Sequence, residues 1–255
     1  DGQQGYTVVD NPNPNQTPAT PDPNQPQFAD TAPDPFKVFQ NMSDFLGKQS
    51  QLTMQLSDTS DEIADTGSKI QMSSTRTVYM QRPDQLAVDF VGDNASRRVV
   101  YDGKTVTAVD LTHNAYTTIP MQGTLDEMMD KLAKDYGMAQ LVDNLLYKDI
   151  YKRVLPKLQA GQYVGTDTVG GVKCDHIAFR QEGIDWEMWV QQGDKPMPRK
   201  ISVTHTDLAS HPQYTLEITK WSAAPIPASA FDVKIPKDAQ KIDALTMSAE
   251  VKKDQ

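Results

Sequence analysis

The chain has 255 residues, a formal net charge of −9 and a pI near 4.9. This acidity argues against nucleic acid and against anionic lipid head groups as partners, because both require a basic protein surface. No apolar run reaches the roughly 18 residues of a membrane-spanning helix, and the single cysteine, Cys174, excludes an internal disulfide. We therefore expect a monomer that is at most peripheral or tethered to a membrane.

The first 33 residues differ in composition from the rest of the chain. They are polar and rich in proline and asparagine, with almost no apolar residue after Val9. Such a segment buries too little apolar surface to offset the entropy of ordering. Residues 1–33 are predicted to be an extended linker, either a tether that holds the domain away from a surface or a plain disordered terminus. A flexible tail is expected for residues 243–255.

The start at Asp1 rather than at methionine is consistent with a removed signal peptide or with a trimmed chain. The folded part is predicted to begin at Asp34, which suits a helix N-cap, with Pro35 at the first helical position. Gly47 is a natural stop for this helix. About six strands with alternating apolar residues are then expected up to Ile119, with a hairpin turn at Asp-Gly of the Tyr101–Lys104 segment.

The hydrophobic period changes from two to 3.6 after residue 120. Thr124-Leu-Asp-Glu127 is a capping box, and apolar residues then recur at i, i+3, i+4 and i+7, which is typical of amphipathic helices. Three short helices are predicted between residues 125 and 155. The alternating pattern resumes at Tyr163. Further strands are expected at residues 174–180, 186–190, 199–205, 214–221 and 231–235.

A long sheet with one apolar face and one helical insertion is expected to curl, with the helices across its concave side. The predicted fold class is therefore α+β, with one domain over residues 34–242. We expect an unclosed, curved antiparallel sheet, or half-barrel, of about ten or eleven strands. Helices should cover the concave face, which carries Trp186 and Met188.

Residues that could support catalysis or metal binding are sparse. Cys174 and His176 share one face of a strand, but they form an incomplete metal site without further ligands. Side chains so placed are also too far apart for a nucleophile pair. The acidic Asp126, Glu127 and Asp130 are explained by the dipole of the helix on which they lie. Phosphate-binding, dinucleotide-binding and nucleophile-elbow motifs are missing. We predict no catalytic residue, no metal site and no cofactor.

Methionines gather in and next to the helical insertion, at positions 121, 128, 129 and 138. Methionine adapts to variable apolar partners, so these side chains either contact a ligand or fill an ordinary core. The candidate ligand-binding residues lie on the predicted helices and on the strand that faces them. They are Met128, Met129, Leu132, Leu141, Leu145, Leu146, Trp186 and Met188.

Seven segments resemble a family of predicted periplasmic bacterial proteins of unassigned function, which is similar in fold to the lipoprotein-localisation factors LolA and LolB. The resemblance covers about residues 34–242, and it is most specific from Cys174 to Lys200. The segments are Tyr101-Asp-Gly-Lys-Thr105, Tyr116-Thr-Thr-Ile-Pro120, Leu145-Leu-Tyr147, Tyr163-Val-Gly-Thr166, Gly171-Val-x-Cys-x-His-x-Ala-Phe-Arg180, Asp185-Trp186-x-x-Trp189 and Pro196-x-Pro-Arg-Lys200.

The resemblance implies a curved, unclosed sheet with helices in its mouth, and in the related carriers the space between them takes up acyl chains. The first hypothesis is a periplasmic or cell-envelope protein, its signal peptide removed, that holds a lipid or lipoprotein acyl chain between the sheet and a helical lid. The second is an envelope protein-interaction or sensor module with an ordinary packed core and no ligand. A hydrolase is a third class, for which the sequence offers no catalytic group.

Overall fold

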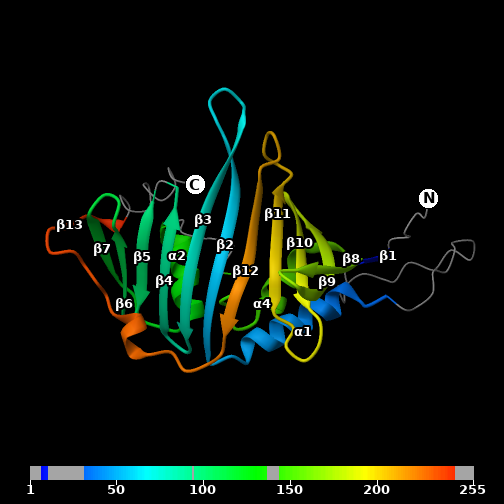
Figure 1. The fold of residues 1–255 in the computed structure, drawn as a ribbon, viewed down its shortest axis with the longest axis horizontal. Coiled ribbons are helices and arrows are strands. Elements are labelled where there is room, and N and C mark those ends of the chain that lie inside the picture. The colour runs from blue at the N-terminus through cyan, green and yellow to red at the C-terminus, as the bar shows by residue number, and fades with distance from the viewer. Residues whose placement is uncertain (1–6, 11–31, 94, 137–143, 245–255) are drawn as a thin grey trace, which may run out of the picture.

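The computed structural model describes residues 7–10, 32–93, 95–136 and 144–244. Within this part of the chain, thirteen strands form one sheet in the order β1-β8-β9-β10-β11-β12-β2-β3-β4-β5-β6-β7-β13 (Figure 1). The end strands of this order, β1 and β13, do not pair with each other in the described residues, so the sheet is unclosed. The α+β class and the unclosed sheet are confirmed, with a few more strands than expected.

The bounds of the elements are as follows. The strands are β1 (Thr7–Asp10), β2 (Gln51–Ile63), β3 (Lys69–Gln81), β4 (Gln85–Gly92), β5 (Ser96–Tyr101), β6 (Thr105–Asp110), β7 (Ala115–Pro120), β8 (Leu158–Val169), β9 (Val172–Gln181), β10 (Ile184–Gln191), β11 (Pro198–His205), β12 (Gln213–Ser222) and β13 (Gln240–Lys241). The helices are α1 (Pro35–Gly47), α2 (Leu125–Tyr136) and α4 (Ile150–Val154), with short 3-10 turns η1 (Leu155–Lys157) and η2 (Ala228–Phe231).

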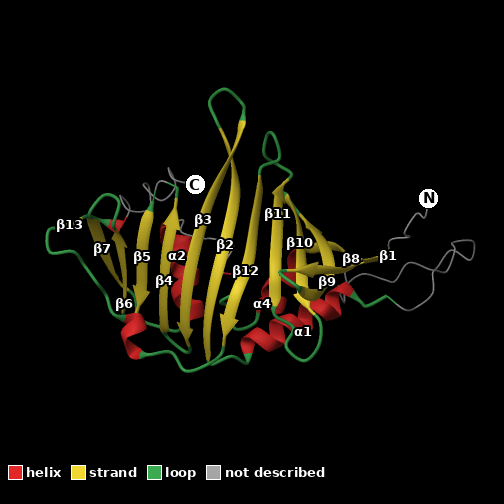
Figure 2. Cartoon of the chain, viewed as in Figure 1, coloured by secondary structure: helices red, strands yellow, loops and turns green. Residues whose placement is uncertain are grey.

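Two antiparallel meanders make up most of the sheet, as Figure 2 shows in yellow. Strands β2 to β7 form one and β8 to β12 form the other, and each pairs its strands in chain order. The two meanders meet where β12 pairs with β2, with Leu216 opposite Asp58. One pairing departs from the expected antiparallel sheet, since the two-residue strand β13 runs parallel to β7.

The local signals at the starts of α1 and α2 act as the sequence predicted. Asp34 caps α1 by accepting a hydrogen bond from the Phe36 amide at 2.9 Å. At α2, the Thr124 amide donates to Glu127 Oε2 at 2.7 Å and the Glu127 amide donates to Thr124 Oγ1 at 3.4 Å, a reciprocal capping box. These bonds satisfy amides that the first helical turn leaves without partners.

Gly47 has a different role from the predicted one. It lies inside α1, and the C-cap is Lys48. A Cβ at position 47 would lie 2.3 Å from the carbonyl oxygen of Lys148. The glycine therefore allows the end of α1 to approach the backbone that precedes α4, and no left-handed turn is required there.

The chain between β12 and β13 also differs from the prediction. The strand expected at residues 231–235 is absent from these described residues, which form η2 and coil. Arg98 holds this crossing segment by donating to the carbonyls of Ala230 at 2.7 Å and Asp232 at 3.2 Å. Because the segment runs outside the sheet, Val233 and Ile235 are exposed. The alternation of apolar and polar residues at 231–235 therefore does not correspond to a strand paired in the sheet.

Three further differences concern element ends. Strand β8 begins at Leu158, five residues before the predicted start. Of the three predicted helices, α2 and α4 are present, α4 with only 5 residues, whereas residues 137–143 of the middle one lie outside the described residues. Within the predicted linker, Thr7–Asp10 pairs with β8. The rest of the linker up to residue 31 and the tail from residue 245 also lie outside the described residues.

Candidate functional site

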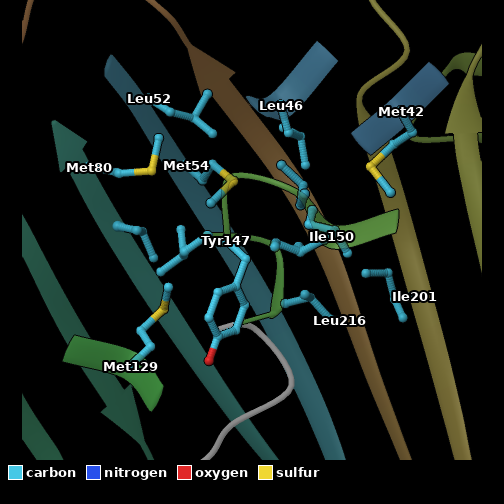
Figure 3. Close-up of a cluster of buried hydrophobic side chains, with 14 of the residues drawn as sticks. Met42, Leu46, Leu52, Met54, Met80, Met129, Tyr147, Ile150, Ile201 and Leu216 are labelled. Carbon is cyan, nitrogen blue, oxygen red and sulfur yellow. The ribbon is translucent and has the colours of Figure 1, made fainter. Parts of the chain in front are cut away.

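One apolar core joins the inward face of the sheet to α1, α2 and the segment from Leu145 to Ile150. We call the sheet side of this core the concave face, and α1, α2, α4 and the turn at residues 144–149 the lid. Figure 3 shows Leu52, Met54 and Met80 of the strands facing lid residues across the core. The predicted arrangement of helices over an apolar sheet face is thus present.

The strand residues of the candidate site lie under α1. Trp186 and Met188 are buried on β10. The Trp186 ring stacks on Phe179 at a centroid distance of 4.6 Å and meets Phe39 of α1 edge-on at 5.4 Å. The direct cover of Trp186 is therefore the first helix, which was expected to share the lid with the helices of residues 125–155.

The candidate residues of α2 lie over the other meander. Met128 and Met129 are buried and Leu132 is partly buried against the same core. The hydroxyl of Tyr101 on β5 donates to the Gly123 carbonyl at 2.6 Å and fixes the start of α2 above this meander. Burial raises the pKa of Tyr101, which keeps the hydroxyl protonated as a donor.

Leu145 and Leu146 are buried in the turn between α2 and α4, and Leu141 lies outside the described residues. Arg82, at the end of β3, donates to the Leu146 carbonyl at 2.9 Å. The Lys148 amide donates to Asp126 of α2 at 3.2 Å. These bonds fix the turn to the sheet and to α2.

A polar cluster ties the lid together around Tyr147, whose ring is buried among the side chains of the core (Figure 3). This hydroxyl donates to Asp130 of α2 at 3.0 Å. Arg153 of α4 forms an ion pair with the same carboxylate, and its guanidinium lies 3.7 Å from the centre of the Tyr147 ring. Both helices and the turn thus meet at one carboxylate.

Four charged residues on β2, β3, β5 and β6 interrupt the concave face, and we call them the polar row. Asp58 forms an ion pair with Arg76, whose Nε lies 3.0 Å from the carboxylate, and Asp110 accepts from Arg97 Nε at 3.1 Å. Asp58 is 2% exposed and Asp110 is fully buried. Residues two positions apart on a strand point to the same face of the sheet. Leu56, two positions from Asp58, lies in the core, so Asp58 also points to the concave face.

The outer carboxylates of the row have additional donors. Ser74 Oγ and the Tyr214 hydroxyl both donate to Asp58. Burial by itself would raise the pKa of Asp110. Hydrogen bonds from the His113 amide and ring, together with Arg97, outweigh it and lower the pKa of this carboxyl below its ordinary value. Asp110 is therefore held in ionised form beside Arg97.

The polar row was not predicted from the sequence. Its signal is a charged residue that interrupts the apolar alternation of a strand. Such a residue occupies an inward position, where every second residue is otherwise apolar. Asp58 continues the series of Leu52, Met54 and Leu56 in this way, and Arg76 precedes Val78 and Met80. Such positions read as the solvated ends of strands when only periodicity is considered.

Cys174 and His176 lie away from the lid. Cys174 is buried, its thiol donates to the Val172 carbonyl at 3.4 Å, and burial raises its pKa. The His176 ring stacks on Trp189 at 4.0 Å, and its Nε2 lies 2.7 Å from Glu187 Oε2. The described residues contain no group of three or more His, Cys, Asp or Glu side chains placed to hold a metal ion.

Residues 36–245 match the family described as "Predicted periplasmic protein (DUF2092)". The chain belongs to this family. The match spans both meanders, the lid and the polar row, so all of the candidate site lies within the family's domain. No curated protein matches the chain.

Several solved structures are similar to this one. An uncharacterized conserved protein from Thermus thermophilus is 12% identical with a TM-score of 0.48, covering 81% of this chain and 97% of that chain. Lipoprotein LppX of Mycobacterium tuberculosis is 14% identical with a TM-score of 0.47, covering 75% and 96%. LolA superfamily protein NE2245 of Nitrosomonas europaea is 8% identical with a TM-score of 0.35, covering 79% and 99%.

Among the described helices, none has the length and apolar character needed to cross a bilayer.

Proposed function

We propose that this protein is a cell-envelope binding protein that holds a lipid or acyl chain between the concave face and the lid. The observation that carries the proposal is the construction of the lid. Three short helices and a turn cover the apolar face of an unclosed sheet, and α2 and α4 are tied to each other by the polar cluster at Tyr147, Asp130 and Arg153. Opening such a cover breaks the polar cluster and uncovers apolar side chains but leaves the strand pairing intact, whereas opening a closed barrel would break strand pairing.

The side chains under the lid suit an acyl chain. Met128 and Met129 of α2, with Leu145 and Leu146 of the turn, present flexible or branched apolar groups with no polar atom that needs a partner. Apolar surface of this kind binds hydrocarbon through its area rather than through directed bonds. We take the protein to act as a monomer in the periplasm, without a catalytic residue, a metal or a cofactor.

A second function is favoured by the burial of the same residues. Met128, Leu145 and Met188 are only 2–3% exposed and belong to one continuous core. Close-packed cores leave few voids larger than a water molecule. An envelope protein-interaction or sensor module with an ordinary packed core accounts for this observation without a ligand.

Substitution by tryptophan separates the two functions. If a ligand occupies the space beneath α2, Met128→Trp or Leu145→Trp should be tolerated in stability while binding of a fluorescent fatty-acid probe is lost. In a packed core the same changes overpack and cost about 1–3 kcal/mol. Val91→Trp, at an exposed position, is the control that should change neither quantity. Denaturation midpoints and probe titrations distinguish the two functions. If the wild type binds no probe and the two tryptophan variants are destabilised, the lipid-binding proposal is refuted.

A further inference from the structure

The polar row has no explanation in packing alone. Removing a charged pair from water is costly, and replacement of a buried ion pair by apolar groups is often neutral or stabilising. The concave face nevertheless carries two such pairs, with Arg76 buried and Arg97 nearly so. Both pairs lie on strands of the meander that α2 covers.

The register of the strands sets the order of the row. Arg76 on β3 is the cross-strand partner of Phe90 on β4, Phe90 is the partner of Arg97 on β5, and Arg97 is the partner of Asp110 on β6. Cross-strand partners share a face and lie close together. Arg76 and Arg97 therefore stand on either side of Phe90 in the row, and Asp58 and Asp110 lie at its outer ends.

The centre of the row is consequently its most positive part. The Arg76 guanidinium lies 5.3 Å from the centre of the Phe90 ring. A guanidinium has five N–H donors in a planar fork, so one arginine can serve a resident carboxylate and a ligand oxygen together. Hydrogen bonds from a guanidinium to a carboxylate are also among the stronger ones in proteins.

The apolar part of the face begins next to this centre. Two residues further along their strands, Val78, Val88 and Val99 occupy the neighbouring inward positions. All three belong to the core or pack against it. A ligand that crosses this boundary has a charged end at the row and a hydrocarbon end under α2.

We propose that Arg76 and Arg97, on either side of Phe90, bind the carboxylate head of an amphiphile whose acyl chain lies under the lid. This assignment rests on the proposed function and adds to it the class of the ligand, a single-chain carboxylic acid. Asp58 and Asp110 orient the two arginines through the ion pairs of the row.

The test compares a fatty acid with its own methyl ester on the full chain. We would titrate the fluorescent probe cis-parinaric acid and its methyl ester, which share a hydrocarbon chain and differ in the charge of the head. The acid should bind the wild type at least about tenfold more tightly, as expected for hydrogen bonds to a charged group. Equal binding of acid and ester would overturn the assignment while leaving the proposed function intact, and binding of neither would overturn both.

Neutral replacement of each ion pair locates the effect. Asp58→Asn with Arg76→Gln, and separately Asp110→Asn with Arg97→Gln, each replace one ion pair of the row by neutral side chains of similar size. Each double variant should lose most of the preference for the acid and keep its affinity for the ester. Arg180→Gln with Asp185→Asn changes an exposed ion pair in the same way and should keep the preference. Folded row variants that retain the full preference would show that the arginines do not bind the head.

Discussion

The two parts of the core under the lid are built from different side chains. Under α1 the core is aromatic, and Phe36, Phe39, Phe179 and Trp186 meet one another at centroid distances of 4.6–5.6 Å. Under α2 it is formed mainly by methionine, leucine and valine together with Tyr101 and Tyr147, and it ends at the polar row. Rings in edge-on and stacked contact fix one geometry, whereas methionine adapts to several. The aromatic part is thus suited to anchoring the lid, and the methionine part to receiving a ligand.

The largest expected effect is on the aromatic part. Phe39 contacts Tyr151, Phe179 and Trp186 and is buried. Phe39→Ala should therefore lower the free energy of unfolding by about 3–5 kcal/mol. Met129→Ala under α2 should cost less, about 2 kcal/mol, because neighbouring side chains can rearrange, and it should weaken probe binding. Urea unfolding measures the free energy of unfolding of both variants. A larger loss of stability for Met129→Ala than for Phe39→Ala would contradict the assignment of the aromatic part as the anchor of the lid.

A single added methyl group tests how closely the aromatic part is packed. A Cβ at Gly161 of β8 would lie 2.8 Å from ring carbons of both Phe36 and Phe179. Gly161→Ala should cost about 1–3 kcal/mol by overpacking, with probe binding retained in the folded protein. Thermal unfolding measures the loss. An unchanged midpoint would show that α1 is free to move away from the sheet.

Smaller effects are expected away from the lid. Cys174→Ala and His176→Ala should each change stability by ~1 kcal/mol, the usual size for single substitutions, and should leave probe binding unchanged. Metal analysis of the purified wild type accompanies this test. Stoichiometric zinc would contradict the prediction that these residues are structural.

The smallest effect concerns pH and the polar row. Because the folded-state pKa of Asp110 is lowered, its ionised form contributes stability that is present above the unfolded pKa. That contribution is lost as pH falls through the folded pKa. The free energy of unfolding of Asp110→Asn should accordingly depend less on pH than that of the wild type between about pH 7 and about pH 3. Identical pH profiles would mean that the carboxyl has the same pKa in both states.

Local signals in the sequence predicted most elements and several of their ends. Alternation identified the long strands, and the Asp34 cap and the capping box at Thr124 marked the two helix starts correctly. The Asp-Gly turn forms as expected, with Asp102 accepting from the Lys104 and Thr105 amides at 2.9 and 2.8 Å. Each of these signals depends on residues a few positions apart, which is why periodicity and turn chemistry suffice.

Contacts between distant segments could not be predicted in the same way. Pairing of β12 with β2 brings Leu216 beside Asp58, and nothing local specifies that register. Gly47 depends on the approach of Lys148, and the cover over Trp186 depends on where α1 lies. The ion pairs of the polar row join separate strands, so each charged residue on its own resembled a strand end. Whether Met128, Met129, Leu132, Leu145 and Leu146 contact a ligand stays a prediction.

Native mass spectrometry of the purified protein tests whether it holds an acyl amphiphile. The experiment compares the protein as purified with the same protein after organic extraction and incubation with a fatty acid. We predict a mass above that of the bare chain by one acyl amphiphile, lost on extraction and regained on incubation. The mass of the bare chain alone in every sample would contradict it.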